Sequence, residues 1–181
     1  IYTSVDTYGN SAEYIRKGLN FKLFEKNLIK ALELFSDQKI IVMCTFNILS
    51  IPAFHHMLDW IADLKSEHKN LQLDISYLKN PEYLSAYLAH KNLISKVQDD
   101  YRRMINLQCY APHEINKFKR VNDWLQSKFD SNEILRYRAD FYNFINEYDR
   151  RMGFNFKESF PELKDFYQLT ENASRFFNTN L

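Results

Sequence analysis

Three polar side chains near the start of the chain could take part in a ligand site. Ser4 and Asp6 lie on one side of an alternating, strand-like segment, 1–6, and Arg16 follows on a short polar helix expected at 11–17. A guanidinium holds a carboxylate by paired, charge-assisted hydrogen bonds, and a hydroxyl at a strand end can orient it. Because ligands of parallel α/β proteins bind at the carboxyl ends of strands, we expect a ligand site here.

Two of these residues also have a structural interpretation. A cation near a helix C-terminus is favourable on dipole grounds alone, which would account for Arg16. An aspartate that follows a strand often forms a turn or cap by bonding to its own backbone, which would account for Asp6. The sequence leaves both interpretations open.

Two further strands are expected, at 39–47 and 71–78. The first, KIIVMCTFN, is almost continuously apolar and rich in β-branched residues, which is typical of a parallel strand covered on both faces. The second, LQLDISYL, alternates, so that Gln72, Asp74 and Ser76 share one side. Asp74 and Ser76 either line the interior of a barrel or form a hydrogen-bonded pair.

Helical periodicity accounts for the remaining segments. Helices are expected at 21–35, 53–68, 81–107, 113–129, 132–152 and 161–177. Asn20 is expected to cap the first of them, and Ser50, with Pro52 just inside, the second. Strands joined by crossover helices of this length predict parallel pairing.

The chain therefore divides into a strand-bearing part, 1–80, and a helical extension, 81–181, that packs on it. Three parallel strands followed by helices form half of a barrel or half of an open sheet, and such a half leaves strand edges exposed. The chain also begins with Ile1 directly inside a strand pattern. Either the numbering has been trimmed, or this is the C-terminal part of a longer protein, and we expect the second.

Composition argues against several classes of protein. The 24 basic residues nearly balance the 23 acidic ones, so neither nucleic acid nor an anionic membrane is an expected partner. The basic residues of 117–120 near Trp124 are interpreted as a solvated helix face. The longest apolar run, 40–46, is far shorter than the roughly 20 residues of a membrane span. With two cysteines, Cys44 and Cys109, a reducing compartment, the cytoplasm, is expected.

Four sequence blocks, in order, resemble the second half of radical S-adenosylmethionine enzymes. SVDTYGNSAEYIRKG followed by NFKLFEKNL resembles the fourth strand and helix, MCTFNILSIPAF the fifth strand and helix start, and DISYLKNPEYLS the sixth strand. FINEYDRRMGFNFKESFPELKDF resembles the C-terminal tail of the group that carries a twitch domain for an additional iron–sulfur cluster. The resemblance runs over essentially the whole chain.

The resemblance implies a fold, a cofactor and a missing part. The fold would be the C-terminal half of a six-stranded partial TIM-type barrel, and the intact enzyme would use S-adenosylmethionine and a 4Fe-4S cluster to generate a 5′-deoxyadenosyl radical that modifies an unknown substrate. The family's cluster loop, Cys-x-x-x-Cys-x-x-Cys, does not occur in this sequence. We therefore expect no metal ligands here, since the cluster needs closely placed thiolates, and we expect the N-terminal half of the protein to supply them.

The same resemblance assigns residues to the cofactor. Ser4 and Arg16 match the serine and the arginine that face its methionine portion, and Asp6 belongs to a Ser-x-Asp-Gly pattern in which Thr7 stands where glycine is usual. Asp149, with Glu147 and its neighbouring arginines, would form surface ion pairs or close over the barrel mouth.

The later strands carry the remaining assignments. Asn47 matches the residue that meets the ribose, although a turn-forming asparagine is the alternative. Tyr77 and Leu78 would contact adenine, and both are equally well interpreted as ordinary core residues. A function of another class also remains open: a non-catalytic half-barrel that serves as a binding or assembly module, with its exposed strand edges paired in a dimer.

Overall fold

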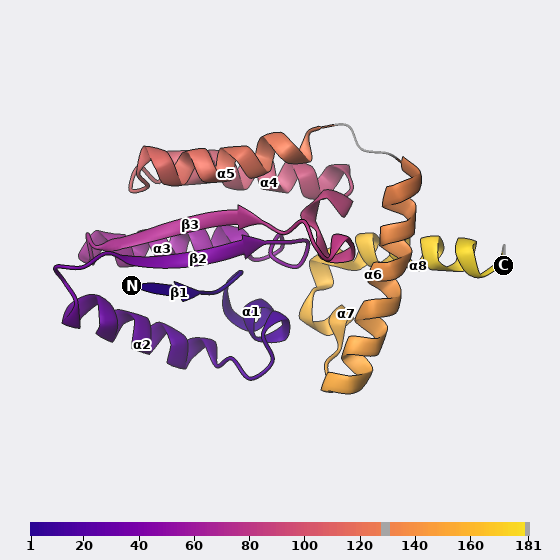
Figure 1. Cartoon of the computed structure of the whole chain (residues 1–181), viewed down its shortest axis with the longest axis horizontal. Coiled ribbons are helices and arrows are strands. Elements are labelled where there is room, and N and C mark those ends of the chain that lie inside the picture. The colour runs from indigo at the N-terminus through magenta and orange to yellow at the C-terminus, as the bar shows by residue number, and fades with distance from the viewer. Residues whose placement is uncertain (128–130, 180–181) are drawn as a thin grey trace.

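A three-stranded parallel sheet lies at the centre of the protein (Figure 1). The structure, a computed structural model, describes residues 1–127 and 131–179. The strands are β1 (Tyr2–Ser4), β2 (Ile40–Phe46) and β3 (Leu71–Tyr77), in the order β1-β2-β3. All pairs are parallel. The expected α/β class, with three parallel strands joined by crossover helices, is confirmed.

Helices connect the strands and make up the C-terminal half of the chain. They are α1 (Gly9–Ile15), α2 (Phe21–Leu34), α3 (Phe54–Glu67), α4 (Lys91–Asn106), α5 (Pro112–Leu125), α6 (Ser131–Met152), α7 (Phe156–Ser159) and α8 (Lys164–Thr179). Short 3₁₀ turns, η1 (Glu82–Leu84), η2 (Ala86–Leu88) and η3 (Pro161–Leu163), lie between them. No described helix combines the length and the apolar character that a membrane crossing requires.

Three local expectations need correction. The helix expected at 81–107 begins only at Lys91, because 82–88 forms 3₁₀ turns whose Leu88 is fully buried. Ser50 does not cap α3, since its hydroxyl accepts a hydrogen bond from the backbone N–H of Asn47. The helix expected at 113–129 ends at Leu125, and residues 128–130 lie outside the described residues.

The cap of α2, by contrast, is as expected. The side-chain oxygen of Asn20 accepts a hydrogen bond of 2.9 Å from the backbone N–H of Leu23. This satisfies one of the N–H groups that a helix leaves unpaired in its first turn.

The two faces of the sheet differ sharply in burial. One face packs against helices and carries the buried side chains Val42, Cys44, Phe46, Leu73 and Ile75. The other, here called the open face, carries Tyr2, Ser4, Ile41, Met43, Thr45, Gln72, Asp74 and Ser76, which the strand register aligns in rows. In Figure 1, α3 lies behind β2 and β3, and no helix lies in front of them.

The expectation that the second strand is covered on both faces is therefore wrong for this chain. Burial alternates along β2, and the Met43 side chain on the open face is 43% exposed. Tyr2, in the neighbouring strand, is 69% exposed. An apolar run in a sequence does not say which of its two faces a helix will cover, because that depends on how many layers the chain supplies.

Helix α5 closes the outer edge of β3. The carboxylate of Glu114 accepts hydrogen bonds from the backbone N–H of Leu73, at 2.7 Å, and of Ala111, at 2.6 Å. It also binds Lys65 Nζ, at 2.6 and 2.5 Å, and it is fully buried. A strand edge presents unpaired N–H groups, so this carboxylate replaces part of a neighbouring strand.

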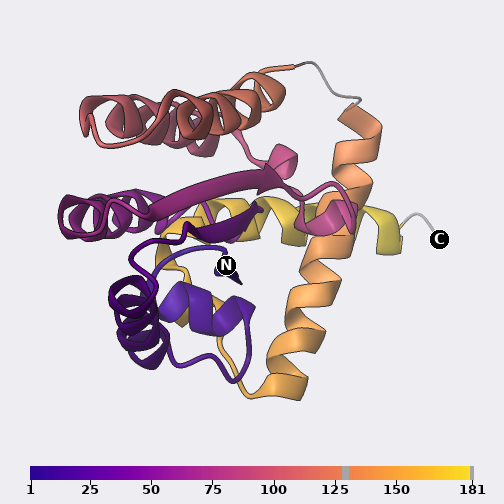
Figure 2. The ribbon, with the colours of Figure 1, turned by 60° about the vertical axis from the view of Figure 1, so that its left-hand side comes forward.

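Helix α6 runs across the direction of the strands, beyond their C-terminal ends (Figures 1 and 2). It packs against η1 and η2, which follow β3, and along α8. The C-terminal helices thus stand at the same end of the sheet as the expected ligand site.

We expect Glu114→Gln to lower the free energy of unfolding by about 3 kcal/mol, because it leaves the mostly buried ammonium of Lys65 without its counter-charge. Urea unfolding followed by circular dichroism measures the loss. The double variant Lys65→Met/Glu114→Gln should lose less, since no unpaired charge remains. Lys119→Gln, in an exposed ion pair with Asp123 on the same helix, is the control. Equal losses in the single and double variants would contradict the assignment.

Candidate functional site

The buried carboxylate of Asp6 joins three elements at the C-terminal edge of the sheet. Its Oδ1 accepts a hydrogen bond of 3.0 Å from the backbone N–H of Thr45 in β2, and its Oδ2 accepts one of 2.9 Å from Nε of Arg16. Its backbone oxygen lies 3.4 Å from the thiol of Cys44, which donates to it. The Asp6 side chain therefore does not form the local turn or cap that is the alternative interpretation of the sequence, and it fixes Arg16 relative to β1 and β2.

Arg16 lies just past the end of α1 and reaches back toward the strands. Its side chain is 40% exposed, and its one hydrogen bond among the described residues is the bond from Nε to Asp6. The two terminal nitrogens of the guanidinium therefore keep their donors available. A guanidinium held through Nε presents its remaining fork to a second acceptor, the geometry that suits a carboxylate.

Helix α1, which positions Arg16, is anchored to the C-terminal part of the chain. The hydroxyl of Tyr14 donates a 2.6 Å hydrogen bond to Asp149 in α6, and the hydroxyl of Tyr148 donates to the backbone oxygen of Tyr14 at 2.8 Å. Burial and the neighbouring carboxylate raise the pKa of Tyr14. Asp149 also accepts from the N–H of Phe156, at 2.7 Å.

The sequence interpretation of Asp149 as a member of a surface ion pair is therefore wrong. Its carboxylate is a structural hydrogen-bond acceptor. The surface ion pairs are those of Glu147 with Arg150 and Arg151. Sequence reasoning missed the bond between Tyr14 and Asp149 because its partners are 135 positions apart, and neither sits in a pattern that marks the other.

Ser4 lies on the open face, at the end of β1. It is exposed, it sits opposite Met43 in the strand register, and its hydroxyl has no hydrogen-bond partner among the described residues. Ser4 is two residues before Asp6, so the hydroxyl and the Asp6–Arg16 pair belong to the same strand end. Of the residues that the sequence singles out, the structure joins Asp6 and Arg16 directly, and Ser4 belongs to the same strand end.

Asn47 is committed to the turn that follows β2. Its side-chain NH₂ donates to the backbone oxygen of Thr45 at 3.0 Å, and its side-chain oxygen accepts from the N–H of Leu49 at 2.9 Å. Thr7 packs against the same turn, where its hydroxyl donates to the backbone oxygen of Ser50 at 3.2 Å. These bonds fit the turn-forming interpretation of Asn47.

The backbone around Thr7 does not need the glycine that the family pattern has there. The left-handed conformation falls two residues later, at Gly9, where φ is 59°. A residue with a Cβ rarely adopts that conformation.

Tyr77 and Leu78, at the end of β3, have different surroundings. The ring of Tyr77 stacks on Trp124 of α5, with centroids 4.5 Å apart, and so points away from the open face. Leu78 is half-buried, and its backbone N–H continues the ladder by donating to the oxygen of Phe46 at 2.9 Å. Of this pair, only Leu78 has a side chain placed by strand alternation on the side of the open face.

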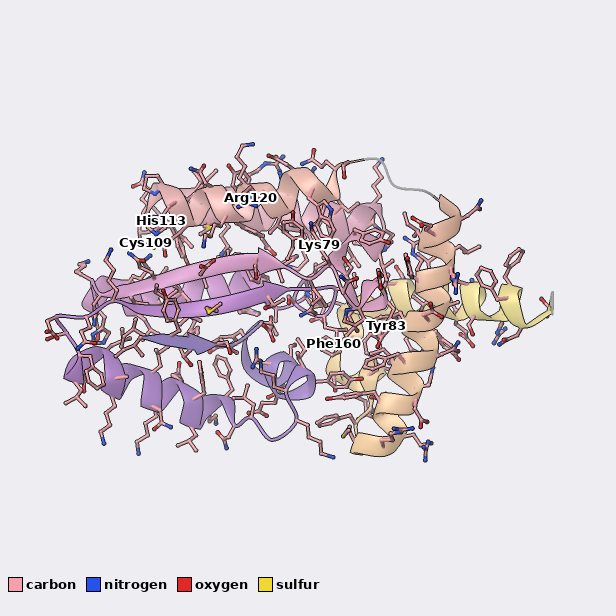
Figure 3. The ribbon with its side chains drawn as sticks, viewed as in Figure 1. Lys79, Tyr83, Cys109, His113, Arg120 and Phe160 are labelled. Atoms are coloured by element: carbon pink, nitrogen blue, oxygen red, sulfur yellow. The ribbon has the colours of Figure 1, made fainter. Side chains whose placement is uncertain are left out.

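Both cysteines, Cys44 and Cys109, are free thiols. Burial raises the pKa of Cys44 well above its ordinary value, and burial also raises that of Cys109. Cys109 lies at the other end of the sheet from Lys79, which follows β3 (Figure 3). Within residues 1–127 and 131–179, no cluster of histidine, cysteine and acidic side chains has the makings of a metal site.

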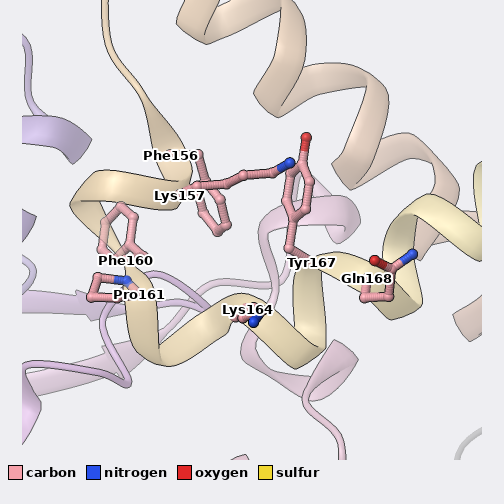
Figure 4. Close-up of a pocket in the computed structure, with 7 residues that line it drawn as sticks. All are labelled: Phe156, Lys157, Phe160, Pro161, Lys164, Tyr167 and Gln168. Atoms are coloured by element: carbon pink, nitrogen blue, oxygen red, sulfur yellow. The ribbon is translucent and has the colours of Figure 1, made fainter.

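A cavity of about 290 Å³ lies in the C-terminal tail (Figure 4). Its walls come from α7, η3 and α8 and include Phe156, Phe160, Lys164 and Tyr167. The amine of Lys157 sits 5.1 Å from the centre of the Tyr167 ring, whose hydroxyl donates to Asn146. Burial raises the pKa of Tyr167 to about 12, so this phenol is neutral at physiological pH. The cavity is mainly apolar, and the side chains of Lys157 and Lys164 are among its polar lining.

Comparisons of the chain with family models, with curated proteins and with solved structures find no match.

Two substitutions of Asp6 distinguish the contributions of its two hydrogen bonds to stability. Asp6→Ala leaves the N–H of Thr45 and the guanidinium of Arg16 without their acceptor, and we expect a loss of about 2–3 kcal/mol in the free energy of unfolding. Asp6→Asn keeps an acceptor for Thr45 and should lose about 1 kcal/mol. Urea unfolding of both variants tests the order. An alanine variant as stable as the asparagine variant would show that the bond to Thr45 contributes nothing.

Proposed function

We propose that this chain is the cofactor-binding C-terminal half of a radical S-adenosylmethionine enzyme. One observation carries the proposal: the Arg16 guanidinium is held by Asp6 at the C-terminal edge of a parallel sheet, with its terminal nitrogens unpaired among the described residues and the hydroxyl of Ser4 on the same strand end. The sequence resemblance assigns Ser4 and Arg16 to the methionine portion of the cofactor, and this arrangement supports that assignment.

Each residue at this edge has a defined task in the proposal. The fork of Arg16 binds the carboxylate, Ser4 orients it, and Asp6 holds the guanidinium in place through Nε. Leu78 offers apolar contact to adenine, while Tyr77, which packs on Trp124, supports the strand end from behind. Asn47 shapes the turn beside the ribose through its bonds within that turn.

The iron–sulfur cluster does not fit the residues of this chain. The sequence has two cysteines, one of them fully buried at the packed face of β2, and burial disfavours both thiolates. In the proposal the cluster ligands therefore belong to the N-terminal half of the same protein. When bound beside that cluster, the cofactor would supply a carbon-centred radical to an unknown substrate, and this chain would hold it and exclude water.

The two edges of the sheet support a half-barrel. The outer edge of β3 is closed by Glu114, whereas β1 pairs only with β2 among the described strands and leaves its other edge open. Further parallel strands of a barrel would therefore add beside β1, and the open face would become the barrel interior. The sequence encoded upstream of Ile1 tests this directly, since the proposal expects a strand followed by Cys-x-x-x-Cys-x-x-Cys there.

In the full-length protein, Arg16→Ala should weaken S-adenosylmethionine binding about 30-fold, or about 2 kcal/mol, because a charge-assisted pair is lost. Isothermal titration calorimetry measures the affinity. Arg16→Lys keeps the charge but not the two parallel donors, and its affinity should lie between those of the wild type and of Arg16→Ala.

Arg102→Ala is the matched control for Arg16→Ala. Arg102 belongs to an exposed ion pair with Asp99 on α4, so its removal should leave the affinity unchanged. Wild-type affinity in Arg16→Ala would remove Arg16 from the site and, with it, the main support for the proposal.

A specific observation also favours a second candidate, a non-catalytic assembly module. Tyr2 and Met43 both expose large apolar side chains on the open face, where Tyr2 lies opposite Ile41 and Met43 opposite Ser4. Such surfaces are commonly covered by a partner. In this case two copies of the chain would pair their open faces or their β1 edges. Size-exclusion chromatography with light scattering should then give a dimer that Tyr2→Lys/Met43→Lys converts to a monomer. A wild-type monomer would contradict the assembly module.

A further inference from the structure

A cationic hollow lies at the C-terminal end of β3. Arg16 lies at the other edge of the sheet, beside β1. It has a volume of about 310 Å³ and is lined by Asp74 and Ser76 from β3, Lys79 from the following segment, and Lys117 and Arg120 from α5. Figure 3 shows Lys79 just beyond β3 and Arg120 on α5 above it. The hollow adjoins the open face of the sheet, to which Asp74 and Ser76 belong.

The charges around this hollow do not cancel. Lys117 Nζ lies 2.5 Å from a carboxylate oxygen of Asp74, so these two groups neutralise each other. Lys79 and Arg120 make no ion pair with any described residue, and the amine of Lys79 lies 5.6 Å from the centre of the Tyr77 ring. One carboxylate among three cations leaves an excess of two positive charges.

Helix α5 fixes the cations in position because it follows the edge of β3 for several turns. Glu114 binds the N–H of Leu73 near the start of the helix, and Trp124 stacks on Tyr77 near its end. Lys117 and Arg120, one turn apart between these two anchors, therefore face the strand. Lys119 instead pairs with Asp123 on the exposed side of the helix.

We propose that this hollow binds a phosphoryl group, in its dianionic form, on a small molecule. Two uncompensated charges match a dianion, the guanidinium of Arg120 offers two parallel donors, and Lys79 adds a point charge. The Ser76 hydroxyl makes only a long bond, 3.4 Å, to the oxygen of Cys44, so it can turn to the ligand.

This assignment replaces, for Lys117 and Arg120, the expectation of a solvated helix face. It needs neither the cofactor nor the cluster, so it goes beyond the function proposed above. If that function holds as well, the phosphoryl group would mark the substrate. A small molecule is favoured over nucleic acid because the cations are confined to one hollow in a chain whose charges balance overall.

Titration of the 181-residue chain with inorganic phosphate at pH 8 tests the site. Backbone amide shifts of residues 76–79 in ¹H–¹⁵N NMR spectra should saturate, with a dissociation constant of about 1 mM or below. Formate at the same ionic strength, a monoanion, should produce much weaker shifts. These spectra also report whether each variant is folded.

Three substitutions make the test specific. Arg120→Gln and Lys79→Gln should each weaken phosphate binding about tenfold, because each removes one charge-assisted contact. Asp74→Asn should strengthen it about threefold, because it removes the one carboxylate of the hollow and frees Lys117. Lys119→Gln, one residue before Arg120, is the control and should bind as the wild type does.

Several outcomes would overturn the proposal. Shifts that do not saturate, or that formate reproduces, would reduce the effect to ionic strength. Wild-type affinity in both glutamine variants would remove these cations from the site. A single-stranded RNA oligonucleotide that binds far more tightly than phosphate, with a steep salt dependence, would assign the surface to nucleic acid instead. None of these results bears on Arg16, so the two proposals fail separately.

Discussion

The geometry of the candidate site depends on one buried carboxylate. Asp6 accepts one hydrogen bond from the backbone of β2 and one from the guanidinium of Arg16, so that the end of β1, the end of β2 and the end of α1 are held together. A buried carboxylate without donors would be strongly disfavoured, and both of its donors come from other elements. The bond to Thr45 ties the two strand ends together, and the bond to Nε of Arg16 leaves the two terminal nitrogens of the guanidinium without a partner among the described residues.

A second carboxylate sets the limits of the sheet. Glu114 binds the backbone of β3 from α5 and ends the sheet on that side, whereas the outer edge of β1 has no such device among the described residues. Natural sheets protect exposed edges or pair them. The two edges therefore differ: the edge at β3 is covered, and the edge at β1 is open among the described residues. In the proposed half-barrel, further strands would add at the β1 edge.

The sequence predicted the strands well, because alternation and apolar runs directly reflect the pleat of a strand. It placed Asp74 and Ser76 on one face, and the structure confirms that they share the open face. It could not predict the role of Asp6, because an N–H that belongs to the backbone of Thr45 leaves no mark on residue types. For the same reason it assigned Ser50 to a helix cap, although the hydroxyl serves the turn at Asn47. Contacts between distant backbone and side chains are decided by packing, which local patterns do not encode.

The two cationic positions at the C-terminal edge of the sheet stand on opposite sides of β2. Arg16 belongs to the β1 side, and Lys79 with Arg120 to the β3 side. Strand β2 lies between β1 and β3 in the sheet. A ligand carboxylate held at one anchor and a phosphoryl group held at the other would place the bodies of both molecules over the end of β2. The side chains there are Met43 and Thr45, which are small or flexible and carry no charge. If both proposals hold, the two ligands would be bound by their charged ends, and the neutral side chains between them would not react with the groups held there.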